Sequence, residues 1–89
     1  MKEDYKLQIF ARFNNKTILI DLLPNDKIIR IKNDIMNKNN ITNSNILYIT
    51  WNGRIINEEL TICDYDIQKH QTVNVLVRAG TGPITPNYN

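Results

Sequence analysis

The sequence is poor in the residues on which many small proteins rely for cross-links or chemistry. Its 89 residues include one cysteine, one histidine, three glycines and three prolines. The single cysteine, Cys63, excludes an internal disulfide and any metal or iron–sulfur site made of cysteines alone. No activating histidine can be assigned to Cys63, so we expect a small buried side chain and not a catalytic thiol. His70 lies beside Lys69 in a polar turn and is expected to be solvated.

Long apolar runs and clusters of one charge are also missing. The charged start, residues 1–6, is followed by no apolar run, so neither a signal peptide nor a membrane span is predicted. The net charge is only +2 and the basic residues are scattered, which argues against a nucleic-acid surface. No paired carboxylates, metal-ligand cluster or phosphate-binding glycine loop occurs at usable spacing. We therefore expect a cytoplasmic or nuclear monomer that is not an enzyme and needs no cofactor.

The clearest positive signal is a helix over residues 24–38. Asp26 is expected to cap its first N–H groups, and Asn39 or Asn40 to close it in a left-handed conformation. Lys32 and the other polar residues are assigned to the solvent side. Three branched apolar residues recur at i, i+3 and i+7 and form one face: Ile28, Ile31 and Ile35.

The rest of the chain reads as strands and turns. Asn14-Asn15 and Asn52-Gly53 are expected to form two-residue hairpin turns, because such turns need positive φ at both positions. Residues 60–69 have no clear period and are interpreted as a compact loop with one helical turn. Alternating or apolar runs predict strands at 7–13, 16–23, 46–51, 54–56 and 72–78. These elements predict an α+β fold in which a mixed β-sheet packs on one α-helix.

A change in composition marks the ends of the domain. Two of the three glycines and two of the three prolines follow residue 79. We therefore expect one folded domain over residues 7–79, a lead of residues 1–6, and a flexible C-terminal tail over residues 80–89.

In their order and lengths, these elements resemble the β-grasp fold of the ubiquitin family. The strongest match is residues 64–69, DYDIQK, which differ from the ubiquitin motif only by Asp66 in place of asparagine. In that motif the tyrosine hydroxyl holds the loop to nearby backbone and the isoleucine fills the core, so the resemblance implies these roles for Tyr65 and Ile67. Further matches are residues 8–10 and 16–18, with Pro24, Asp26 and Ile28 at the junction of strand and helix. The core implied by the resemblance is Ile9, Ile18, Ile20, Leu22, Ile28, Ile31, Ile35, Ile49, Ile56, Ile62, Ile67, Val73 and Val75.

The recognition surface departs from that of ubiquitin. Ubiquitin binds its receptors through an apolar patch made of a leucine in the first hairpin turn, an isoleucine, a histidine and a valine. The first turn here has no leucine, the isoleucine and histidine positions fall on Thr50 and Asn74, and only Leu76 stays apolar. Each lost anchor is worth about 1.5–3 kcal/mol, so the usual weak binding is expected to be abolished.

We therefore predict non-covalent docking of proteins from a ubiquitin-related pathway onto an altered surface. The surface is basic with one aromatic residue. It consists of Arg12, Tyr48, Thr50, Gly53, Arg54, Asn74, Leu76 and Arg78. Trp51 is expected to pack against the sheet, and Phe10 with Leu19 to expose a separate apolar patch.

The alternative function is that of a covalent modifier processed from a precursor. Conjugated members of the family end in Gly-Gly, whereas the aligned position here is Thr81-Gly82, followed by Pro83. Processing would therefore fall after Gly82 or after Gly80. The resemblance aligns Lys69 with a lysine that links ubiquitin chains. For Lys69, and for Lys16, Lys32 and Lys38 near other such positions, a solubilising surface charge is the preferred interpretation.

Overall fold

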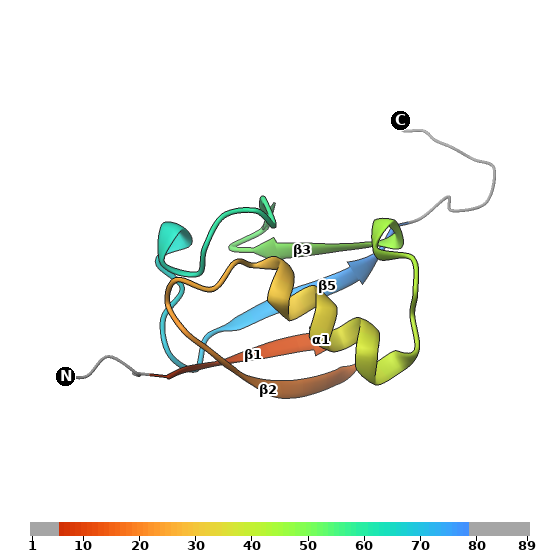
Figure 1. Cartoon of the computed structure of the whole chain (residues 1–89), viewed down its shortest axis with the longest axis horizontal. Coiled ribbons are helices and arrows are strands. Elements are labelled where there is room, and N and C mark those ends of the chain that lie inside the picture. Colours follow the sequence, from red (N-terminus) through yellow and green to blue (C-terminus); the bar gives the residue numbers. More distant parts are fainter. Residues whose placement is uncertain (1–5, 79–89) are drawn as a thin grey trace.

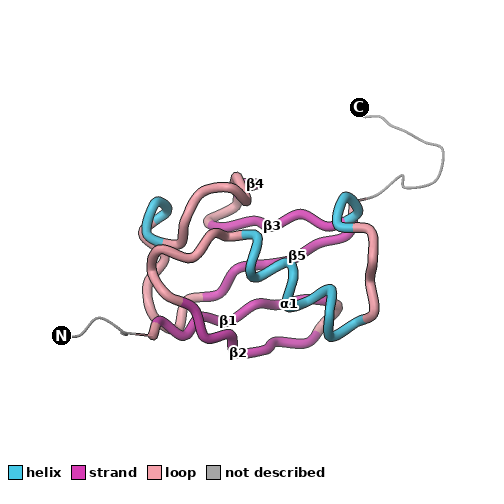
Figure 2. The backbone as a smooth tube through the Cα atoms, viewed as in Figure 1, coloured by secondary structure: helices cyan, strands magenta, loops and turns pink. Residues whose placement is uncertain are grey.

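The computed structural model describes residues 6–78, and its elements form two layers (Figures 1 and 2). A five-stranded mixed sheet in the order β2-β1-β5-β3-β4 is crossed on one face by α1. The α+β β-grasp arrangement predicted from the sequence is confirmed. The elements are β1 (Leu7–Phe13), β2 (Lys16–Leu22), α1 (Ile29–Asn39), the 3-10 helix η1 (Ser44–Ile46), β3 (Leu47–Trp51), β4 (Arg54–Ile55), the 3-10 helix η2 (Cys63–Tyr65) and β5 (Thr72–Val77).

Asparagine supplies the unusual backbone conformations that the two hairpins require. Asn14 and Asn15 have φ values of 55° and 66°, and Asn52 and Gly53 have 54° and 78°. Both turns therefore have positive φ at their two central positions, as predicted. The first turn sets the register of β1 and β2, which pair from Phe13 opposite Lys16 to the far end of both strands.

The start of α1 differs from the prediction. The helix begins at Ile29, and Asp26 does not cap it. The Asp26 carboxylate instead accepts the backbone N–H of Leu23 at 2.8 Å and the Nη1 of Arg30 at 3.1 Å. This carboxylate therefore closes the turn that precedes the helix.

The long loop after β4 takes the role that was expected of a capping side chain. The backbone N–H of Ile28 donates to the carbonyl of Leu60 at 2.8 Å, and that of Ile29 donates to the carbonyl of Glu58 at 3.0 Å. These partners are distant in sequence, so local capping rules could not reveal them. At the other end, Asn40 is left-handed with φ 56°, which confirms the prediction for the helix terminus.

The core lies between α1 and the inward-facing side chains of the sheet, and twelve of the thirteen implied residues are buried in it. The exception is Ile18, which is only partly buried on an edge strand, β2. Leu47, which is fully buried, was missed. The expectation for Cys63 was wrong: its side chain is exposed, with Sγ 3.3 Å from the Oγ1 of Thr61. The buried apolar residues are Leu7, Ile9, Ala11, Ile20, Leu22, Ile28, Ile31, Ile35, Leu47, Ile49, Ile56, Ile62, Ile67, Val73 and Val75.

Lys32 is buried, contrary to its assignment to the solvent side of the helix. It is only 5% exposed. Its Nζ donates to the carbonyls of Ser44 at 2.9 Å and Leu47 at 3.3 Å, and lies 2.6 Å from Oε1 of Glu58. Lys32 stands four residues after Ile28, so helical periodicity turns it toward the apolar stripe. Its charge is held inside by these three oxygen partners.

The loop before β5 is held as the resemblance implied. The hydroxyl of Tyr65 accepts the backbone N–H of Asn57 at 2.7 Å, and Ile67 is only 3% exposed. The tyrosine therefore links η2 to the segment that follows β4, and the isoleucine fills the core beneath it.

Replacing Tyr65 with phenylalanine is expected to lower the free energy of unfolding by about 0.5–1.5 kcal/mol, because the Asn57 N–H loses its acceptor. Urea unfolding of the two proteins measures the loss. The ring stays in place, so the slope of the unfolding transition should not change. An unchanged midpoint would show that water replaces the hydroxyl at no cost.

Candidate protein-interaction surface

The face of the sheet that points away from α1 carries most of the residues predicted to bind a partner. Successive side chains of a strand project to opposite faces, so the buried residues of each strand alternate with outward ones. Asn74 of β5 lies between Arg12 of β1 and Thr50 of β3 in the strand register. We call this side of the sheet the outer face; it consists of Arg12, Tyr48, Thr50, Ile55, Asn74 and Leu76, with Arg78 beside them.

An aromatic and a cation lie together at the end of the outer face. Tyr48 is directly opposite Leu76 in the antiparallel pairing of β3 and β5. The guanidinium carbon of Arg78 stands 5.1 Å from the centre of the Tyr48 ring. The Arg78 backbone N–H donates to the carbonyl of Ile46 at 2.7 Å, which fixes the chain just after β5. This arrangement orients Arg78 over the ring and exposes the Leu76 side chain next to it.

Ile55 belongs to the outer face and was not identified from the sequence. It is the most exposed large apolar residue among those described, at 64%. Ile55 is opposite Thr50 across the hairpin formed by β3 and β4. The sequence contained this information, because a two-residue turn at Asn52-Gly53 places Trp51 opposite Arg54 and Thr50 opposite Ile55. Thr50 stands where ubiquitin's patch has an isoleucine, and an apolar side chain, Ile55, lies beside it on the neighbouring strand.

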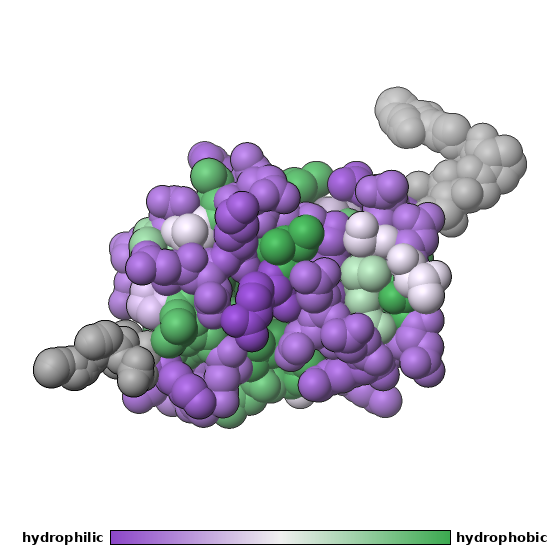
Figure 3. Space-filling model, in the orientation of Figure 1, coloured by the Kyte–Doolittle hydropathy of each residue, from purple (hydrophilic) through white to green (hydrophobic). Residues whose placement is uncertain are grey.

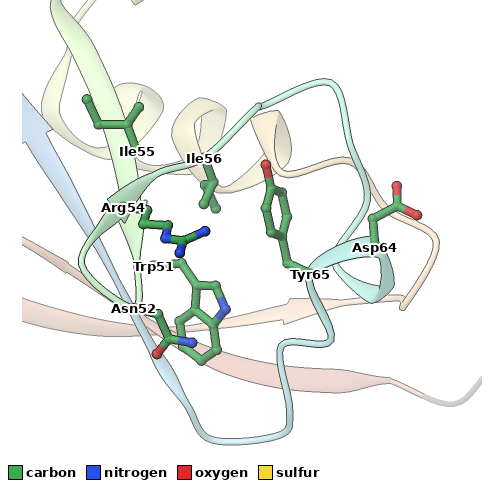
Figure 4. Close-up of a pocket in the computed structure, with 7 residues that line it drawn as sticks. All are labelled: Trp51, Asn52, Arg54, Ile55, Ile56, Asp64 and Tyr65. Atoms are coloured by element: carbon green, nitrogen blue, oxygen red, sulfur yellow. The ribbon is translucent and has the colours of Figure 1, made fainter.

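Arg54 does not lie on the outer face. It is paired with Trp51 and precedes Ile55, so its side chain projects to the other side of the hairpin. There it lines a hollow of about 540 Å³ together with Trp51 and Tyr65, and Figure 4 shows these three side chains around one space. Trp51 is partly buried and packs against the core, and Gly53 occupies the turn between the two faces.

The outer face has a positive electrostatic character. Arg12 donates from Nη1 to the Thr17 hydroxyl at 3.2 Å, and neither Arg12 nor Arg78 has an ion-pair partner among residues 6–78. The carboxylate of Asp21, four residues beyond Thr17 on β2, accepts from the side-chain amide of Gln8 at 2.9 Å. Acidic groups on a partner could therefore approach two available guanidinium groups.

The remaining predicted residues are separate from this face or lie outside the described range. Lys69 is exposed in the turn that leads to β5, next to His70, which has φ 66° and is also exposed. Lys16 and Lys38 are exposed as well, unlike the buried Lys32. Gly80 and Gly82, with the rest of the predicted tail, lie outside residues 6–78.

The described part of the chain shows two further negative findings. Residues 6–78 contain no group of three or more histidine, cysteine, aspartate or glutamate side chains arranged to hold a metal ion. Within the same range, no helix combines the length and apolar character needed to cross a bilayer.

The comparison with known proteins agrees with this architecture. The model of the ubiquitin family matches residues 7–80, which include every described residue except Lys6. The chain therefore belongs to the ubiquitin family. Members of this family are generally modifiers or interaction domains that have no catalytic activity of their own, and they generally interact with proteins.

Proposed function

We propose that this ubiquitin-like domain acts by non-covalent docking and that a partner protein of a ubiquitin-related pathway binds its outer face. The observation that carries the proposal is the exposed pair Leu76 and Ile55, at 41% and 64%, on a face that also presents Tyr48 under Arg78. Aromatic and arginine side chains are the residue types most often dominant in protein interfaces.

The apolar and basic side chains of the outer face indicate which side chains a partner would need. Thr50 and Asn74 replace two anchors of ubiquitin's patch with polar groups, so the apolar contact is divided between Ile55 and Leu76. Arg12 and Arg78 favour a partner with acidic residues around an apolar centre. Arg54 and Gly53 border the face at the hairpin, with Arg54 on its reverse side.

A substitution at Leu76 tests the docking surface. A photo-crosslinking side chain at Thr50 identifies the partner in cells of the source organism, and purified partner is then titrated. Leu76→Asp is expected to weaken its binding about 10- to 100-fold, because an apolar contact is lost and a charge is buried unpaired. Leu60→Asp is the matched control, since Leu60 is 39% exposed and lies on the loop after β4. Equal affinities for both variants would exclude the outer face as the docking site.

The alternative, a covalent modifier, is favoured by the two glycines that follow the end of β5. Gly80 and Gly82 come soon after Val77, where a reactive terminus would have to emerge. Chains ending at Gly80 or at Gly82 can be incubated with ubiquitin-family activating enzymes and ATP. Docking predicts no thioester from either chain and an unconjugated protein in source cells by intact-mass measurement. A thioester, or adducts of higher mass, would favour the modifier.

A further inference from the structure

The hollow on the reverse side of the β3–β4 hairpin is lined by two aromatic rings. Its volume is about 540 Å³, and the rings are the indole of Trp51 and the phenol of Tyr65. Both side chains are partly buried and pack against the core, and the Tyr65 hydroxyl accepts the Asn57 N–H at 2.7 Å. The rings are therefore held in place before anything binds, and little ordering is needed for them to contact a ligand.

Two side-chain donors of the hollow have no acceptor within residues 6–78. They are the guanidinium of Arg54, which also has no ion-pair partner there, and the indole N–H of Trp51. The carboxylate of Asp64 accepts the backbone N–H of Thr61 at 2.9 Å, and Figure 4 shows it beyond the ring of Tyr65, remote from Arg54. A carboxylate from outside the chain could therefore accept from both donors.

The exposed rim of the hollow favours a side chain of a partner protein over a free small molecule. Pockets for small molecules have volumes of about 300–1,000 Å³ and bury about 70–90% of the ligand surface. Here Asn52, Arg54 and Ile55 on the rim are all exposed, and the helix-side view of Figure 3 shows polar surface over much of the molecule. A small molecule would stay largely in water, whereas a protein partner would cover the rim around an inserted side chain. Ile55 also belongs to the outer face, so a partner docked there is already next to the hollow.

We propose that the hollow receives an aromatic side chain of the docking partner, and that an acidic residue next to it in the partner's chain binds Arg54. The inserted ring packs against Trp51 and Tyr65 in the offset or edge-to-face geometry that aromatic rings prefer. The carboxylate accepts from the Arg54 guanidinium and from the Trp51 indole N–H. This inference rests on the proposed docking function, because it names a second contact of the same partner.

Charge determines which residue must accompany the aromatic one. A cationic side chain could lie against the two rings, but the Arg54 guanidinium would repel it. The adjoining outer face has two more arginines without ion-pair partners among residues 6–78, Arg12 and Arg78. Both surfaces therefore favour an acidic partner, and the same segment of that partner can satisfy both.

Trp51 is the only tryptophan of the chain, so its fluorescence reports directly on the hollow. The probe is a synthetic peptide with one phenylalanine between glutamates. One control peptide has alanine in place of the phenylalanine, and another has lysine in place of the glutamates. The probe is expected to bind the full chain at least about tenfold more tightly than either control and to change the Trp51 emission. Amide chemical shifts should change at Trp51, Arg54 and Tyr65.

Two variants with the same loss of charge separate the hollow from the general positive charge of the protein. Arg54→Gln should weaken binding of the probe about tenfold, because the carboxylate loses its cationic partner. Lys16→Gln is the matched control and should leave binding unchanged, since β2 and β4 lie at opposite ends of the sheet. Arg54→Lys keeps the charge but not the planar fork, so its affinity should be intermediate.

Leu76→Asp distinguishes this inference from docking at the outer face. The peptide contacts the hollow alone, so Leu76→Asp should leave its affinity unchanged. A partner that binds Leu76→Asp like the wild type but Arg54→Gln more weakly would exclude the outer face and support the hollow. The inference is overturned if a folded Arg54→Gln protein binds the probe like the wild type, or if the control peptides bind as tightly as the probe. It is overturned equally if Trp51 emission changes with protein concentration alone, which would place a second copy in the hollow.

Discussion

Replacing Ile67 with alanine is expected to lower the free energy of unfolding by about 2–5 kcal/mol, because a buried branched side chain leaves a cavity. Ile67 is 3% exposed and belongs to the central apolar cluster. A domain of this size has a total stability of about 5–15 kcal/mol, so the loss is a large fraction of the whole. Chemical denaturation followed by circular dichroism measures the change.

The same substitution at Ile55 is the matched control. Ile55 is 64% exposed, so Ile55→Ala should change stability by less than about 0.5 kcal/mol. Because Ile55 lies on the outer face, its alanine variant should still weaken docking of a partner there. Similar destabilisation by both substitutions would contradict the burial pattern on which the two assignments depend.

Replacing Glu58 with alanine is expected to cost about 3 kcal/mol of stability. The substitution leaves the buried Lys32 ammonium with only two carbonyl partners, and breaking a buried ion pair from one side costs about 3–5 kcal/mol. The lower end of that range applies because the Glu58 side chain is 20% exposed and water can reach it.

A double-mutant cycle distinguishes this ion pair from packing. Lys32→Met replaces the ammonium with an apolar end and keeps much of the side chain, so it should cost less than Glu58→Ala. The double variant should be more stable than the sum of the two changes predicts, by about 1 kcal/mol or more. Additive effects would mean that Lys32 and Glu58 do not interact in solution, despite their 2.6 Å separation.

Local rules predicted most of the elements because they depend on residues close together in the chain. The Asn14-Asn15 and Asn52-Gly53 turns, the left-handed Asn40 and the alternation of β5 all follow from such rules. The ends of elements were less predictable. β2 ends at Leu22, and Ile46 belongs to η1 instead of β3. Strand ends depend on which partner is present, and a run of apolar residues does not contain that information.

The errors concern contacts between distant segments. Asp26 has the right chemistry for a helix cap, but the loop around Leu60 supplies the partners of the first N–H groups. Lys32 has the chemistry of a surface residue, but Glu58 and two carbonyls hold its charge inside. In both cases a residue's local preference was overridden by a group far away in sequence.

For the candidate surface, the sequence analysis chose the right segment of the chain but placed one side chain on the wrong face of the sheet. Arg54 and Ile55 are neighbours whose side chains project to opposite faces, and only the apolar one belongs with Thr50. The register across the Asn52-Gly53 turn contains this information, because the turn fixes which residues are opposite each other. Applying that register would have replaced Arg54 with Ile55 in the predicted surface.

The sequence by itself determined the family, the helix, both hairpin turns and the apolar core, because periodicity and turn chemistry act over a few residues. The tertiary structure alone decided that Glu58 and two carbonyls hold the charge of Lys32 inside, and that the loop around Leu60 supplies the partners of the first helix N–H groups. Both features depend on how α1 and the loop after β4 meet in space, and each contact joins residues whose separation along the chain leaves no periodic signal.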